Sequence, residues 1–297
     1  MIGELAALGA SVSWAIAPIL YREALLCTKP ISANIVRCAT NAAVLVAVLL
    51  LLGLAGALAS LPIKTMILVI GSGAIGLGVG DTLYLMGLKY VGVSRAVPLA
   101  ATYPLFSLVW ATFLLHQSLT LGAVLGAVVI VVGIWLLTRE RNGSTAGVTG
   151  RMAFVGLAVS LVTAVVWSVS ISMMNVAVST VTGTAANYAM ITLRIASVAV
   201  FFLVLAPFLD RQRGFLKMTR GTVAALCVGG LVANGLGWFL LNYSFSITSL
   251  VKAVPISSTS PLFAAIAGFL LFKEKMTAKA VLGAVAVVAG ITLIFIL

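Results

Sequence analysis

"AVPLAATYPLF" (residues 96–106) and "AVPISSTSPLF" (residues 253–263) show the same pattern 157 positions apart, with two prolines in each. The match extends beyond the prolines, because residues 96–136 and 253–293 are identical at 19 of 41 positions. Self-similarity at a fixed spacing marks an internal repeat. We therefore predict that the chain consists of two copies of one unit.

The repeat sets the predicted domain organisation. The first half spans 1–138, a polar linker spans 139–150, and the second half spans 151–297. The equivalent pairs outside the best-matching stretch are Gly80 with Gly237 and Arg37 with Arg194 at the same offset, and Trp14 with Trp167 at an offset of 153.

The composition indicates a membrane protein. Of 297 residues, 62% are hydrophobic and 8% are charged, whereas about a quarter of the residues in an average soluble domain are charged. The mean hydropathy is +1.24. Many apolar stretches reach the roughly 20 residues that a helix needs to cross a bilayer, and they lack the period-two alternation of barrel strands. We predict an all-α integral membrane protein with ten transmembrane helices near 3–21, 31–55, 65–88, 94–115, 120–138, 152–177, 184–208, 221–245, 249–272 and 278–297.

The basic residues predict the orientation of these helices. Since each half has five helices, an odd number, the second half enters the membrane from the opposite side, which gives an inverted-topology repeat. The loops after even-numbered spans hold only Lys64 and Lys252. The positive-inside rule then places odd-numbered loops in the cytoplasm and both termini of this multi-pass protein outside. The odd-numbered loops hold fourteen basic residues: Arg22, Lys29, Lys89, Arg95, Arg139, Arg141, Arg151, Arg211, Arg213, Lys217, Arg220, Lys273, Lys275 and Lys279.

The repeated segments also resemble a known family. "GLKYVGVSRAVPLAATYPLFSLVWATFLLHQSLTLGAVLGAVVIVVGIWLL" and "SFSITSLVKAVPISSTSPLFAAIAGFLLFKEKMTAKAVLGAVAVVAGITLI" look like the paired modules of the drug/metabolite transporter superfamily, EamA-like branch. In that family the fourth helix of a module tends to end in Gly-Glu-(Arg/Lys). The second copy has Lys273-Glu274-Lys275, and the first departs from the pattern with His116-Gln117-Ser118. The resemblance implies ten helices, a central cavity between the halves, and transport, often export, of amino acids or related compounds. Together with the short loops, it also implies a location in the plasma (inner) membrane.

The paired prolines predict bent helices. A proline inside a helix removes one backbone hydrogen bond and clashes with the carbonyl four residues back, and interrupted helices at matching positions point to the binding site of a repeat transporter. Ser257 and Ser258 lie beside these positions. Their hydroxyls could contact substrate or could satisfy the local backbone. The predicted hinge or gate residues are Pro98, Pro104, Pro255 and Pro261.

Asp81 is the only acid deep inside a predicted span. It lies roughly 12 Å from the cytoplasmic end of its helix at 1.5 Å per residue, and Arg37 enters its own span from the same side to a similar depth. Two interpretations stay open. Asp81 and Arg37 form an ion pair that braces two helices, or Asp81 takes up a proton or a cationic group during transport.

Arg194 is predicted to lie close to the midplane, roughly 15 Å into its span. Snorkelling to the surface is strained from such a depth, and the second half offers no acid placed to pair with it. Pairing with backbone carbonyls is one interpretation. The other is that Arg194 binds an anionic group of the substrate, such as a carboxylate.

Aromatic and amide side chains complete the predicted cavity. Asn234, Trp238 and Asn242 recur at every fourth position and so share one helix face. Their amides could bond between helices or bind a ligand, in keeping with a site that has few polar groups in an apolar wall. The predicted substrate-binding residues are Trp14, Tyr84, Tyr103, Trp167, Arg194, Asn234, Trp238, Asn242, Ser257 and Ser258.

Enzymatic and cofactor functions are disfavoured. The single histidine has no partner for a metal site, and the GxGxxG spacing at Gly71, Gly73 and Gly76 lies within an apolar span without the strand that dinucleotide binding requires. Such glycines, with Gly76 and Gly80 four apart, favour close helix packing. We expect no cofactor and no bound metal.

The favoured function is secondary transport of a small polar metabolite, an amino acid or related compound, by alternating access and in the direction of export. A proton-coupled exporter of drugs or cationic compounds and a channel-like facilitator are the alternatives. The expected partners are a small-molecule substrate and membrane lipid, with protons as an open question and no nucleic acid. The charge of +12 is accounted for by loops that face anionic lipid. We expect a monomer, with a dimer left open.

Overall fold

The computed structural model describes residues 1–92, 96, 99–114, 116–138, 150–263, 266 and 278–296. Every regular element in these ranges is helical. In chain order the elements are α1 (Ile2–Cys27), α2 (Pro30–Leu51), α3 (Ala55–Ala59), α4 (Ile63–Ser72), the π-helix η1 (Gly73–Gly80), α5 (Asp81–Val91), α7 (Tyr103–Phe113), α8 (Leu121–Thr138), α9 (Gly150–Val178), α10 (Thr184–Leu209), the 3-10 turn η2 (Gly214–Leu216), α11 (Arg220–Gly230), the π-helix η3 (Leu231–Gly237), α12 (Trp238–Ile247), α13 (Leu250–Ser257) and α15 (Ala278–Ile296).

The helices are long and apolar, which confirms the prediction of an all-helical membrane protein. Each of the ten predicted spans overlaps one of these helices. Among the described residues, five helical segments have the length and composition to cross a membrane, and shorter apolar helices accompany them. The five are Pro30–Leu51, Ile63–Val91, Arg151–Val178, Thr184–Leu209 and Arg220–Ile247.

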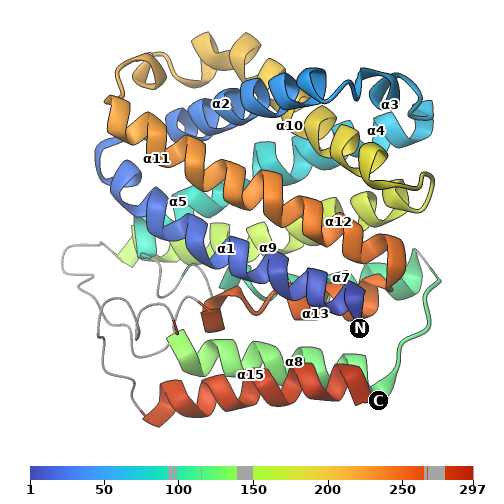
Figure 1. The fold of residues 1–297 in the computed structure, drawn as a ribbon. Coiled ribbons are helices and arrows are strands. Elements are labelled where there is room, and N and C mark those ends of the chain that lie inside the picture. Colours follow the sequence, from blue (N-terminus) through green and yellow to red (C-terminus); the bar gives the residue numbers. More distant parts are fainter. Residues whose placement is uncertain are drawn as a thin grey trace.

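The two halves of the chain interlock. α1 packs on the segment α11–η3–α12 of the second half, and α9 packs on the segment α4–η1–α5 of the first. α2 packs on α10, and α8 lies along α15 at the bottom of Figure 1. Each helix therefore finds its main partner in the other half, so neither half forms the core by itself.

Glycines allow the closest of these approaches, between α8 and α15. A Cβ atom on Gly126 would lie 2.6 Å from the carbonyl oxygen of Gly290, and one on Gly133 would lie 2.8 Å from that of Gly283. Since the residue order is reversed between the two contacts, the helices run antiparallel. At the repeat offset of 157, each contact is equivalent to the other.

The two π-helices occupy equivalent positions in the two halves. η1 ends at Gly80 and η3 ends at Gly237, which are paired by the repeat. π-helical turns are rare and occur mostly at functional sites. The sequence pattern did not predict them, because apolar periodicity within a buried span is too weak to separate 3.6 from more residues per turn.

Helix interruptions occur beside the paired prolines. Turns at residues 101–102 and 258–259 are equivalent in the repeat, and helical structure resumes directly after each. Pro104 is the second residue of α7, where its missing N–H costs no intrahelical bond. Pro255 lies inside α13, Pro261 is the second residue after the second turn, and Pro98 is outside the described residues.

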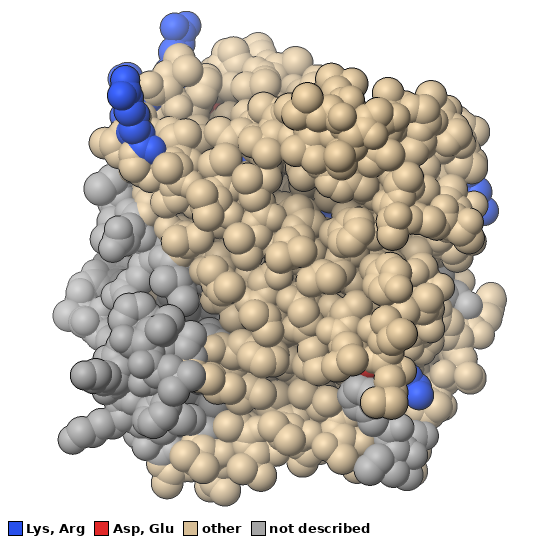
Figure 2. All heavy atoms as spheres, in the orientation of Figure 1, with Lys and Arg blue, Asp and Glu red and all other residues tan. Residues whose placement is uncertain are grey.

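On the face shown in Figure 2, the exposed charged side chains lie at the margins of the bundle. Figure 2 shows Lys and Arg projecting at the edges of a surface that is otherwise almost uncharged, with the helices of Figure 1 crossing between those edges. Both chain ends lie at the right of Figure 1. This distribution is that expected of helices whose middle parts face hydrocarbon.

We predict that Gly126→Ala destabilises the protein by about 1–3 kcal/mol, because the added methyl group would meet the Gly290 backbone and Ile294. Thermal unfolding of the detergent-solubilised protein, followed by tryptophan fluorescence, measures the effect. The matched control is Gly56→Ala in α3, where no atom lies within 4 Å of the new Cβ. Equal unfolding temperatures for the two variants would contradict this account of the α8–α15 contact.

Candidate functional site

A cavity of about 110 Å³ lies between the two halves. Its wall is drawn from α1, α2, η1, α5, α7, α9, α10, η3 and α12. Most of the residues that the sequence analysis selected line it: Trp14, Arg37, Asp81, Tyr84, Tyr103, Trp167, Arg194, Asn234 and Trp238. Asn242, Ser257 and Ser258 do not line it.

Asp81 and Arg37 form a buried ion pair in this wall. An Nη2 hydrogen of Arg37 is donated to Asp81 across 2.5 Å, and the same nitrogen donates to Asn34 at 2.6 Å. The indole N–H of Trp167 donates to the other carboxylate oxygen of Asp81 at 2.8 Å. Both oxygens of Asp81 are therefore engaged, and the pair joins α2, α5 and α9.

Arg194 lies deeper and has no acidic partner among the described residues. It is 1% exposed, and its guanidinium donates from Nη2 to the Ser170 hydroxyl at 2.8 Å. Its guanidinium carbon lies 3.5 Å from the ring centroid of Trp238, a cation–π contact. Its Nε and Nη1 atoms have no hydrogen-bond partner in the part of the chain that the structure describes.

Glycines of η1 make room for Arg194. A Cβ on Gly73 would lie 3.1 Å from Arg194 Cγ, and one on Gly76 would lie 2.9 Å from Arg194 Nη2. The absence of side chains on this face of η1 lets the arginine lie flat between η1 and Trp238. The glycine spacing in this span therefore serves close packing, as the sequence analysis expected.

Two tryptophans cross from one half of the chain to the other in equivalent ways. Trp14 lies against Gly237, where a Cβ would come within 2.6 Å of its Nε1, and Trp167 lies against Gly80, where the nearest indole carbon would be 2.7 Å away. The Trp14 indole donates to the Ala233 carbonyl at 3.0 Å. Only glycine at these two positions admits the indoles.

Aromatic rings form much of the remaining wall, together with small and aliphatic side chains such as Leu77 and Ile171. Trp14 and Trp238 meet with ring centroids 5.9 Å apart. Trp167 contacts Tyr84 at 4.9 Å and Tyr103 at 6.2 Å. Such a wall offers a small ligand a large apolar surface with few polar groups, the usual composition of a binding site.

The hydroxyls beside the prolines satisfy the local backbone. Ser257, Ser258 and Thr259 each donate to the carbonyl three residues earlier, at 2.9, 2.7 and 2.8 Å. Ser257 also lies 3.3 Å from the Tyr103 hydroxyl. Of this cluster only Ser260 reaches the cavity wall.

Asn242 lies outside this cavity and lines a second one together with Asn187. The sequence analysis did not select Asn187, nor Tyr21 and Ser170 of the first site. Helical spacing could have indicated two of them, since Tyr21 is seven residues after Trp14 and Ser170 three after Trp167, on the same faces. Within the described residues, no group of three or more His, Cys, Asp or Glu side chains could hold a metal ion.

The sequence model of the EamA-like transporter family matches residues 1–139 and 154–296. The chain belongs to the EamA-like transporter family. Relatives of this family member include an uncharacterized transporter from Archaeoglobus fulgidus, 25% identical over 298 residues, with 100% of this chain and 99% of the relative covered. Another uncharacterized transporter, from Clostridium kluyveri, is 20% identical over 73% of this chain and 68% of its own.

A solved crystal structure shares the fold. Its chain superposes with a TM-score of 0.76 at 18% identity, covering 98% of this chain and 95% of the other. At this identity the likeness concerns the fold. Membrane transport as the general role of this EamA-like chain follows from the family.

We predict that Asp81→Asn destabilises this transporter by about 3–5 kcal/mol, because Arg37 would remain as a buried charge without its partner. The double variant Asp81→Asn/Arg37→Gln removes both charges and should recover a large part of that loss. Unfolding temperatures of the wild type, Asp81→Asn, Arg37→Gln and the double variant are compared in a double-mutant cycle. Strictly additive effects would contradict the assigned ion pair.

Proposed function

We propose that this chain is a secondary transporter that moves a small carboxylate-bearing metabolite, an amino acid or a related compound, by alternating access. The observation that carries the proposal is Arg194, a buried cation at the cavity wall with two nitrogens that lack partners.

The charge argues for an anionic ligand group. A buried charge is costly unless it is paired and hydrogen-bonded, and Trp238 and Ser170 offset only part of the cost for Arg194. The planar guanidinium matches a carboxylate with two parallel hydrogen bonds. A bound carboxylate would neutralise Arg194 and supply the acceptors that its Nε and Nη1 lack.

The cavity supports a small and partly apolar substrate. Its volume of about 110 Å³ suits a metabolite of few atoms, and the rings of Trp14, Tyr84 and Trp167 would contact the apolar part or an ammonium group. Asn234, with an unpartnered side-chain nitrogen, supplies one further donor. An amino acid presents these features together.

The alternative of a proton-coupled exporter of cationic compounds would rely on Asp81. Both of its oxygens already accept hydrogen bonds, one from Arg37 and one from Trp167. A cation would have to displace Arg37, which would leave two guanidiniums unpaired. The carboxylate substrate needs no such exchange, so we favour it.

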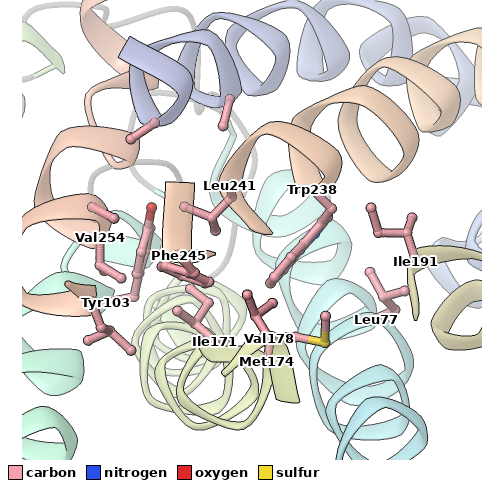
Figure 3. Close-up of a cluster of buried hydrophobic side chains, with 14 of the residues drawn as sticks. Leu77, Tyr103, Ile171, Met174, Val178, Ile191, Trp238, Leu241, Phe245 and Val254 are labelled. Atoms are coloured by element: carbon pink, nitrogen blue, oxygen red, sulfur yellow. The ribbon is translucent and has the colours of Figure 1, made fainter. Parts of the chain in front are cut away.

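Alternating access is supported by the difference between the two ends of the cavity. Tyr21 and Tyr84 line it at one end. Their repeat equivalents, Met174 and Leu241, do not line it and lie in the apolar cluster of Figure 3; Tyr84 is partly exposed whereas Leu241 is fully buried. If the halves are inverted repeats, exchanging the two environments would close the first end and open the second.

The inverted orientation of the halves is supported by three pairs of equivalent features: the antiparallel α8 and α15, the crossed tryptophans and the two π-helices. We propose that the end near Tyr21 faces the cytoplasm of the plasma (inner) membrane, since fourteen of the loop Lys and Arg residues belong to that side. Both termini would then lie outside. We propose export by a monomer of ten transmembrane helices.

A thermal-shift screen of the purified protein against amino acids, organic acids, nucleosides, sugars and cationic drugs tests the substrate class. We predict shifts only with carboxylate-bearing compounds, since a ligand at 100 times its Kd stabilises the folded protein by roughly 2.7 kcal/mol. The shift should disappear in Arg194→Gln. Uptake by reconstituted vesicles should fall by about 10- to 100-fold, as expected for losing hydrogen bonds to a charged group.

Arg194→Lys is the matched control, because it keeps the charge and loses the planar fork. We expect it to retain part of the shift. An Arg194→Gln protein that transports at the wild-type rate would contradict the proposed role. Thermal shifts with cationic drugs that disappear when Asp81 is replaced would favour the alternative, a proton-coupled exporter of cationic compounds.

A further inference from the structure

A second cavity, of about 100 Å³, lies between the ends of α9, α10 and α12. Asn187 of α10 and Asn242 of α12 are its polar residues of deepest burial, 7% and 1% exposed. The cavity belongs to the end of the bundle that is opposite Tyr21 and Tyr84, because its wall includes Val181 and Gly183 of the α9–α10 connection.

The amides in this cavity have unused hydrogen-bonding capacity. Among the residues that the structure describes, neither the nitrogen nor the oxygen of the Asn242 side chain has a hydrogen-bond partner, and the Asn187 side-chain oxygen has none. Asn187 donates to the Phe239 carbonyl at 3.0 Å, which fixes its orientation. A buried polar group without a hydrogen-bond partner costs roughly 1–3 kcal/mol. These amide atoms therefore lower the free energy of unfolding of the protein.

The repeat shows that the fold does not need an amide here. At the offset of 157, Asn242 corresponds to Leu85 in α5. Leu85 is 1% exposed and packs in an apolar cluster. The same helix position is thus filled by an apolar side chain in one half and by an unpartnered amide in the other.

The two cavities are connected by two helices. Along α10, Arg194 lies at the first cavity and Met190 and Asn187 at the second. Along α12, Trp238 lies at the first and Asn242, one turn further on, at the second. Trp238 lines the first cavity and belongs, with Met174 and Ile191, to one buried apolar cluster (Figure 3).

We propose that the second cavity is a second substrate site on the transport route, entered after the ligand passes Trp238. This rests on the proposed function, and it narrows the substrate class. No Asp, Glu, Lys, Arg or His side chain lines the second cavity within the described part of the chain. A ligand that leaves Arg194 for this site must therefore carry no net charge.

A zwitterionic amino acid meets that condition. Its carboxylate accepts from the Asn242 amide nitrogen, and its ammonium donates to the side-chain oxygens of Asn242 and Asn187. A dicarboxylate or a cationic drug would enter a buried uncharged cavity with an unbalanced charge, which is costly. The similar volumes of the two cavities allow the same ligand in both.

The test uses tritiated L-glutamine as the probe, with purified protein in nanodiscs for equilibrium binding and in vesicles for transport. We expect the wild type to bind two molecules per chain. Asn242→Leu should bind one and transport about tenfold more slowly, as expected for losing two hydrogen bonds. Its unfolding temperature should stay at or above that of the wild type, because Leu85 fills the equivalent position.

Arg194→Gln is the matched variant for the first site, and it should retain one bound molecule at the second. A wild type that binds one molecule, lost in Arg194→Gln and kept in Asn242→Leu, would overturn the second site and leave the proposed function standing. An unchanged transport rate in Asn242→Leu would likewise overturn it and assign the cavity to ordered water. A wild type that binds no L-glutamine would contradict the zwitterionic substrate class and thus this proposal, while the screen of other carboxylates tests the proposed function separately.

Discussion

Charge balance inside the bundle is the constraint on which the candidate site depends. Apart from Asp210 at the end of α10, the buried charged side chains among the described residues are the guanidiniums of Arg37 and Arg194 and the carboxylate of Asp81. Asp81 is within ion-pair distance of Arg37, so Arg194 keeps an uncompensated charge. In a low-dielectric interior such a charge is tolerated at a cost, and a transporter can recover that cost each time a carboxylate binds.

The arrangement around this charge is built from elements that the repeat supplies twice. The indoles of Trp14 and Trp167 each lie on a glycine of the opposite half, and each of those glycines ends a π-helix. These two contacts join the halves of the chain beside the cavity. A rocking motion about them would exchange the surroundings of equivalent residues, which is how an inverted repeat can offer one site to two sides.

The sequence predicted much of this, and the limits of prediction have physical causes. The repeat located both helix interruptions, and the scarcity of charge singled out Asp81 and Arg194 before any coordinates. The hydrogen-bond partners of the Ser257 and Ser258 hydroxyls could not be predicted, because a serine in a membrane helix can donate either to a nearby backbone carbonyl or to a ligand. Asn242 shares a helix face with Asn234 and Trp238, yet about 12 Å of helix separates it from Asn234. Residues of this one face therefore line two different cavities.

The most direct test of the central claim compares two ligands that differ only at the group assigned to Arg194. L-glutamine and L-glutaminamide, in which the α-carboxylate is replaced by an amide, would be titrated against the wild type and against Arg194→Gln. The account predicts that the acid binds the wild type at least about tenfold more tightly, the value of one charge-assisted hydrogen bond, and that the preference vanishes in the variant. The same preference in both proteins would contradict a carboxylate at Arg194.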